Sequence, residues 1–88
     1  MRNADRIAEE LRILRAARDG RLRTNNAGRW VIHPAYDLRD APEARPNPKA
    51  RKYLERASCM YGCYARGGGL VMELGDKGRQ MLADHGAA

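Results

Sequence analysis

The stretch Tyr64–Leu82, "YARGGGLVMELGDKGRQML", places three consecutive glycines before a short apolar run, with two more glycines after the run. Gly67–Gly69 suit a tight reversal of the chain, because glycine adopts positive φ without steric cost. Apolar residues alternate in Leu70–Leu74, which is the period of a strand with one buried face. The stretch therefore predicts a β-hairpin with strands at 63–66 and 70–74, followed by a short helix at 76–84.

These glycines also raise the question of a phosphate-binding loop. A P-loop requires the pattern G-x-x-x-x-G-K-[ST], whose backbone N–H groups surround the phosphates and whose hydroxyl binds Mg²⁺. In this chain Asp76 separates Gly75 from Lys77, and Gly78 stands where the hydroxyl is needed. The dinucleotide pattern G-x-G-x-x-G is not matched either. We therefore expect no nucleotide site and no cofactor.

A basic helix is predicted before the hairpin, from Pro48 to about Cys59. Asn47 suits the N-cap and Pro48 the first helical position. Between residues 45 and 56 the chain carries five basic residues and one acid. At roughly 100° per residue, the cations that share one exposed side are Lys49, Lys52 and Arg56. Arg51 and Glu55 fall on the far side and are spaced to pair with each other.

The first part of the chain predicts another helix. Residues 5–18 carry apolar side chains at helical spacing, with Asn3 or Asp5 available as N-cap and Gly20 at the stop position. Arginines and glutamates in this segment stand three or four residues apart, where opposite charges meet on a helix surface. We expect these charges to form a solvated face.

A second hairpin and a loop are predicted between the two helices. Strand-like residues at 22–24 and 29–33 flank Asn-Asn-Ala-Gly, which favours a turn. All four prolines of the chain lie between Pro34 and Pro48, and no apolar period persists there. Residues 34–47 therefore read as a proline-rich loop with at most one helical turn.

Composition favours a polyanionic partner. The chain has 88 residues and a formal net charge of +6, and 14 of its 17 basic residues are Arg. Each neutralised phosphate releases counterions, and Arg can grip phosphate bidentately. GC-rich coding also produces Arg-rich chains, so charge alone does not identify the partner. The length fits a single domain over 1–88 with a thin core, which a homodimer or another partner would help to stabilise.

No membrane segment or metal site is predicted. No apolar run approaches the roughly 18 residues of a membrane span, and the N-terminus lacks the apolar region of a signal peptide, so we expect a cytoplasmic protein. Cys59 and Cys63 could supply half of a zinc site, but zinc needs four ligands, and His33 and His85 are not at finger spacing. We expect both cysteines to be buried thiols that pack as small hydrophobic side chains.

The aromatic residues are expected to be mostly core. The apolar side of the basic helix is formed by Ala50, Tyr53, Leu54, Ala57 and Tyr61. Trp30 and the tyrosines at 53, 61 and 64 are more often core residues than platforms on which bases stack. The position of Tyr36 is left open.

One family resemblance rests on residues 50–82, "ARKYLERASCMYGCYARGGGLVMELGDKGRQML". This stretch resembles the C-terminal half of winged helix-turn-helix DNA-binding domains. The resemblance rests on a helix with a Leu-Glu-Arg-Ala segment, a strand, a glycine hairpin and a closing Leu-x-x-Lys-Gly-Arg-x-x-Leu. The match runs mainly over residues 49–82. Gly75 stands where that family has a capping Thr, and the prolines of 34–46 do not suit a regular second helix.

The resemblance implies an α+β winged-helix-like fold: helix, hairpin, basic helix, wing hairpin and short C-terminal helix. It implies binding of double-stranded DNA, with the helix in the major groove and the wing on the backbone. The DNA-binding residues would be Lys49, Arg51, Lys52, Arg56 and Arg66. We expect a transcriptional regulator or an accessory protein of a phage or mobile element, and not an enzyme.

Two alternatives stay open beside this expectation. The five cations can be solvated charges on an amphipathic helix and a turn, because any exposed helix in so Arg-rich a chain looks basic. The chain can also be a protein-interaction module, such as a small anti-CRISPR-like phage inhibitor that binds a protein or nucleoprotein complex, because one fold hosts unrelated functions.

Overall fold

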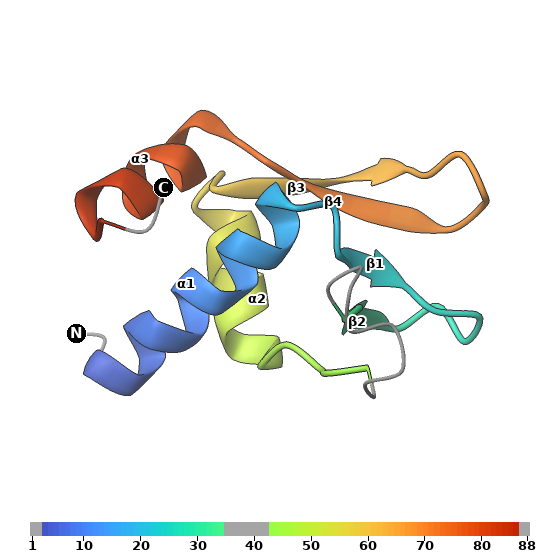
Figure 1. Ribbon diagram of the computed structural model, residues 1–88, viewed down its shortest axis with the longest axis horizontal. Helices are drawn as coiled ribbons and strands as arrows, with labels where there is room; N and C mark the ends of the chain where they lie inside the picture. Colours follow the sequence, from blue (N-terminus) through green and yellow to red (C-terminus); the bar gives the residue numbers. More distant parts are fainter. Residues whose placement is uncertain (1–2, 35–42, 87–88) are drawn as a thin grey trace.

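The structure is a computed structural model that describes residues 3–34 and 43–86, within which the chain forms three helices and one four-stranded antiparallel sheet (Figure 1). In chain order the elements are α1 (Ala4–Arg18), β1 (Leu22–Thr24), β2 (Trp30–Ile32), α2 (Pro48–Arg56), β3 (Met60–Tyr64), β4 (Leu70–Leu74) and α3 (Asp76–Asp84). The small α+β class predicted from the sequence is confirmed.

The first helix begins and ends as predicted. The Asn3 side chain accepts a hydrogen bond from the backbone N–H of Arg6 at 2.8 Å, so Asn3 is the N-cap. Gly20 has a positive φ of 72°, which turns the chain toward β1. The expectation of a fully solvated charged face is wrong at Glu10, which is buried with an exposed fraction of 0% and pairs with Arg6. Burial of a carboxylate is tolerated here because it has a charged partner.

The sheet joins two hairpins in the order β2-β1-β4-β3. The central contact pairs Arg23 of β1 with Val71 of β4. It is reinforced by Thr24, whose hydroxyl oxygen accepts a hydrogen bond from the Leu70 backbone N–H at 2.8 Å. A Cβ added at Gly62 in β3 would lie 3.5 Å from the ring of Trp30 in β2. The sheet is therefore curved enough for one indole ring to reach from one outer strand to the other.

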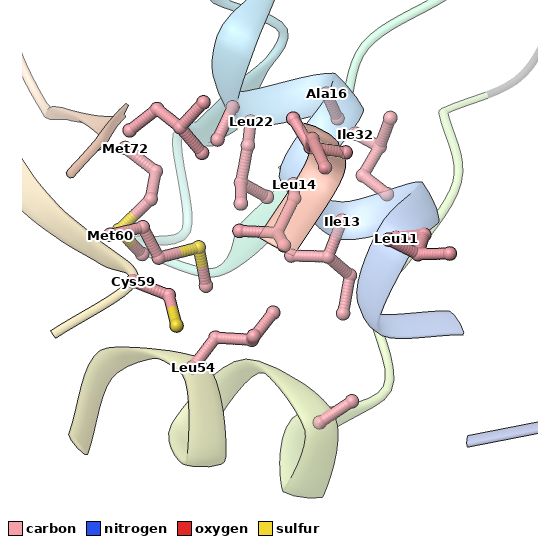
Figure 2. Close-up of a cluster of buried hydrophobic side chains, with 14 residues drawn as sticks. Leu11, Ile13, Leu14, Ala16, Leu22, Ile32, Leu54, Cys59, Met60 and Met72 are labelled. Carbon is pink, nitrogen blue, oxygen red and sulfur yellow. The ribbon is translucent and has the colours of Figure 1, made fainter. Parts of the chain in front are cut away.

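The core lies between one face of the sheet and the three helices. Helix α1 packs against β4, α2 and α3, and α2 packs against β3. Figure 2 shows Leu54 of α2 pointing into the cluster, with Cys59 and Met60 on one side of it and Ile13 and Leu14 of α1 on the other. Ala50 and Leu54 are both fully buried, as their shared helix side predicts. This contact fixes which side of α2 faces solvent.

The β3–β4 hairpin turns on glycine as predicted. The Ala65 backbone N–H donates to the Gly69 carbonyl oxygen at 3.0 Å, and Gly68 and Gly69 have φ of 97° and 71°. A Cβ added at Gly69 would also approach the Thr24 hydroxyl to 2.6 Å. The glycines thus allow the chain to reverse its direction between β3 and β4, and they allow the start of β4 to lie close to β1.

The junction between α2 and β3 differs from the prediction. Helix α2 ends at Arg56, and Ser58 adopts a positive φ of 61°, so β3 starts at Met60 rather than at Cys63. Tyr61 belongs to a strand, and the prediction that placed it on the helix is wrong. The tyrosines do not form the core either, because the exposed fractions of Tyr61 and Tyr64 are 51% and 93%. Trp30 does pack against the core.

The last helix depends on Gly78. A Cβ at this position would collide with the Cys59 carbonyl oxygen and approach the Leu74 side chain, so glycine lets α3 lie directly on the chain before β3. Gly75 is the N-cap residue, and no side chain caps this helix. Helix α3 spans the residues predicted for it, 76–84, and its buried residues are Gly78 and Leu82.

The predicted loop at 34–47 falls partly outside the described residues, which resume at Glu43. Residues 43–47, here called the strap, are not helical, and Ala44 forms an antiparallel bridge with Ile32 of β2. Within the described ranges, the segment between α1 and α2 contains the β1–β2 hairpin and no helix. No helix within residues 3–34 and 43–86 is long and apolar enough to cross a membrane.

Candidate nucleic-acid interface

The exposed side of α2 gathers three cations around one tyrosine. Lys49, Lys52 and Arg56 are exposed, and Tyr53, on the same side, is 36% exposed. No ion pair joins these three cations to an acidic group among residues 3–34 and 43–86. Three of the five predicted DNA-binding residues thus share one surface, which we call the α2 face and define as Lys49, Lys52, Tyr53 and Arg56.

Arg51 lies apart from the α2 face. Its side chain is 18% exposed, and its guanidinium pairs with the Glu55 carboxylate four residues later. The pairing predicted from the spacing is confirmed, and it neutralises much of the charge that Arg51 could offer to a phosphate.

Arg66 is exposed in the turn between β3 and β4. Figure 1 shows this turn projecting away from the helices, at the end of the long hairpin. Arg66 therefore stands at a separate point of the molecule from the α2 face. A polyanion that contacts both must extend along the protein, as duplex DNA does.

The start of α2 is held by its own cap and by α1. The Asn47 side-chain oxygen accepts hydrogen bonds from the backbone N–H groups of Lys49 and Ala50 at 3.0 and 3.1 Å. The Asn47 backbone N–H donates to the Glu9 carboxylate at 2.8 Å. The capped start of the helix is thereby tied to α1.

Glu9 is itself held by Arg12. The Arg12 guanidinium donates two hydrogen bonds to the Glu9 carboxylate, at 2.6 and 2.7 Å, and a third to the Arg45 carbonyl oxygen at 3.0 Å. Hydrogen bonding to Arg12, aided by the Asn47 N–H, lowers the pKa of Glu9, and the same contact raises the pKa of Arg12. The strap is therefore joined to a charged pair that stays ionised at neutral pH.

A groove near the start of α2 brings together residues that the sequence did not connect. It has a volume of about 280 Å³. Its lining residues are Gly28, Arg29, Trp30, Arg45, Pro46, Pro48 and Arg51. We call it the Arg groove. Arg29 and Arg45 stand 16 positions apart in the chain, and no local pattern links a hairpin turn to a strap, so only the tertiary structure could reveal the site.

A larger cleft of about 660 Å³ lies beside β1, where Asp19, Arg21, Arg23 and His33 are among its lining residues. Its cations already have partners: Arg21 pairs with Asp19 at 3.7 Å and donates to the His33 carbonyl oxygen at 3.0 Å. Hydrogen bonding from Arg18 lowers the pKa of Asp19, so the acid stays charged. This cleft is less suited to an anion than the Arg groove, because it contains a carboxylate.

The cysteines are only partly as predicted. Cys59 is buried, whereas Cys63 is half-buried on β3. Desolvation, and secondly the Glu73 carboxylate, raises the pKa of the Cys63 thiol. A thiol with a raised pKa is a weak nucleophile at neutral pH. The part of the chain that the structure describes holds no group of three or more His, Cys, Asp or Glu placed to bind a metal ion.

No family model matches the chain, and neither the curated proteins nor the solved structures provide a match. The candidate interface rests on the charges and contacts of the chain itself: the exposed cations of the α2 face and Arg66 on the far hairpin.

Proposed function

We propose that this protein binds double-stranded DNA through the α2 face. The observation that carries the proposal is the group of three exposed cations on one helix side, without an ion pair within the described residues. Unpaired cations on a rigid helix can neutralise phosphates and release their counterions, which supplies most of the affinity for duplex DNA. The buried Ala50 and Leu54 hold the helix in place from the opposite side.

Two further features support the proposal. A helix with an exposed basic side is followed directly by a projecting hairpin, which is the arrangement that the resemblance to winged-helix proteins implies. Arg66 at the hairpin turn would contact the DNA backbone outside the segment that α2 contacts. A regulator of transcription or an accessory protein of a phage or mobile element would use such an interface, and the proposal includes no reaction.

The test is the salt dependence of duplex binding. Under this proposal the affinity for a generic duplex falls steeply between roughly 50 and 200 mM salt. The variant K49Q/K52Q/R56Q should make the slope of log K, the association constant, against log salt shallower by about 3, since each lost phosphate contact removes roughly 0.9 from its magnitude. The matched control R15Q/K77Q/R79Q removes as many charges from α1 and α3 and should keep most of the slope.

Two outcomes contradict the proposal. A wild-type affinity that does not change with salt argues against DNA binding altogether. An equal loss of slope in both triple variants argues that only net charge matters and that the α2 face has no special role.

A second candidate is a protein-interaction module of the anti-CRISPR-like kind, and the tyrosines of β3 favour it. β3 is an outer strand of the sheet, and Tyr61 and Tyr64 are 51% and 93% exposed. Exposed aromatic side chains on an open strand edge are typical of protein contacts. A gel shift and a pull-down run on the same sample separate the two candidates: a captured protein partner together with no duplex shift favours this one.

A further inference from the structure

The Arg groove has the charge of an anion site. None of its lining residues is acidic. Arg29 and Arg45 are exposed and form no ion pair within residues 3–34 and 43–86, while the charge of Arg51 is already met by Glu55. Two guanidinium groups that form no ion pair in the described part of the chain thus stand at one small groove, and guanidinium groups bind phosphate bidentately.

One wall of the groove is preformed by the strap. Ala44 and Ile32 exchange two backbone hydrogen bonds, at 2.7 and 3.0 Å, which join the strap to β2. On its other side the Arg45 carbonyl oxygen accepts a hydrogen bond from Arg12 of α1 at 3.0 Å. A segment held from both sides loses little entropy when a ligand binds.

The opposite wall is the β1–β2 turn, and it is also held. The Asn25 side-chain oxygen accepts hydrogen bonds from the backbone N–H groups of Ala27 and Arg29 at 2.9 and 3.0 Å. The Asn25 backbone N–H donates to the Arg29 carbonyl oxygen at 2.8 Å. The backbone of Arg29 is therefore fixed, and its side chain extends from a rigid turn.

The groove continues the α2 face. Pro48, which lines the groove, stands four residues before Lys52 of that face, a spacing at which residues of a helix are neighbours on its surface. We propose that the Arg groove binds a phosphodiester of the same DNA backbone that α2 contacts, so that the interface runs past the start of α2 to the β1–β2 turn. This inference rests on the proposed DNA binding and names a second contact site for it.

The fluorescence of Trp30 can report ligand binding in the Arg groove. It is the single tryptophan of the chain, it lines the groove, and it is only partly buried. A phosphate bound between Arg29 and Arg45 changes the charge and hydration beside the indole ring. Binding of a short duplex should therefore shift or quench the intrinsic fluorescence of the wild-type protein, with the same dissociation constant that a gel shift measures.

The test compares three variants by fluorescence titration and by salt slope. R29Q/R45Q should lower the slope by about 2, one phosphate contact for each arginine, and should remove the fluorescence response. R29K/R45K keeps both charges and should restore most of the slope. R15Q/K77Q removes two charges at exposed positions of α1 and α3 and should keep the fluorescence response.

The outcomes separate the two proposals. Suppose that wild type binds with a steep slope, that K49Q/K52Q/R56Q lowers this slope by about 3, and that R29Q/R45Q keeps both the slope and the Trp30 response. In that case the Arg groove is not a phosphate site and the α2 proposal stands. If wild-type binding does not depend on salt, both proposals fail. A thermal melt of each variant shows that it is folded, and unchanged unfolding temperatures are expected because both arginines are exposed.

Discussion

The Glu9 carboxylate of α1 accepts a hydrogen bond from the backbone N–H of Asn47, the N-cap residue of α2, at 2.8 Å. The two residues are 38 positions apart, with the β1–β2 hairpin between them. The contact sets the start of the basic helix relative to α1. Arg12 holds the same carboxylate and also the Arg45 carbonyl oxygen, so one charged pair positions both the α2 face and a wall of the Arg groove.

The first prediction concerns Glu9. Glu9→Gln weakens the hydrogen bonds to Arg12 and to Asn47 and should lower the free energy of unfolding by about 1–2 kcal/mol at pH 7, because bonds to a charged group are stronger than neutral ones. Urea denaturation measures the change. The control Asp76→Asn alters an exposed pair with Arg79 and should have little effect, since exposed pairs contribute little. Equal losses in both variants would contradict a special role for Glu9.

The second prediction is the pH dependence of that difference. The folded protein holds the pKa of Glu9 below its ordinary value of 4.5, so the contribution of Glu9 to stability is fully present above that value. It is lost as pH falls through the lower, folded pKa. The stability gap between wild type and Glu9→Gln should therefore be constant from pH 7 to about 5 and shrink toward pH 3. Denaturation curves across this range check it, and a gap that grows at low pH would reverse the assigned sign.

The third prediction concerns the packing of α3. Gly78→Ala places a methyl group against the Cys59 carbonyl oxygen, which is backbone and cannot rotate away. Overpacking of this kind costs roughly 1–3 kcal/mol, which the better helix propensity of alanine offsets by about 1 kcal/mol at most. We expect a net loss of unfolding free energy in thermal or urea melts. Gly67→Ala is the matched control, because nothing lies within 4 Å of the added Cβ there. A stability gain for Gly78→Ala would refute the close contact.

The fourth prediction separates Arg66 from the helix. Arg66→Gln removes one exposed charge at the hairpin turn and should reduce the salt slope of duplex binding by about 1, with an unchanged unfolding temperature. The loss should add to that of K49Q/K52Q/R56Q, since the turn and the helix stand apart. Gel shifts at several salt concentrations measure both slopes. An unchanged slope for Arg66→Gln would exclude the hairpin turn from the interface.

Local patterns of the chain predicted several elements correctly. Asn47-Pro48 marks the start of α2, and Gly68 and Gly69 mark the hairpin turn. Helix α1 begins after its N-cap Asn3 and ends just before Gly20. Each depends on backbone geometry or hydrogen bonds within a few residues, which sequence spacing describes well. The grouping of Lys49, Lys52 and Arg56 follows equally from helical period.

The mistaken predictions involve contacts that spacing does not describe. Helix α2 was expected to continue to Cys59, but Ser58 takes a positive φ and the chain enters β3 at Met60, where pairing with Leu74 of β4 outweighs helix propensity. Glu10 was expected on a solvated face, yet its side chain is fully buried in the folded protein. Tyr64 looked like a core residue, yet it lies where the hairpin extends beyond the helices.

By itself the sequence determined the α+β class, the caps and turns, and which cations share the outer side of α2, because these follow from interactions between near neighbours. Only the tertiary structure decided that Arg29 and Arg45 line one groove and that the Glu9 carboxylate accepts a hydrogen bond from Asn47. It also decided that Trp30 reaches Gly62 across the sheet. These pairs form because packing the helices on a curved sheet brings distant segments together, a consequence of the whole core that no local period encodes.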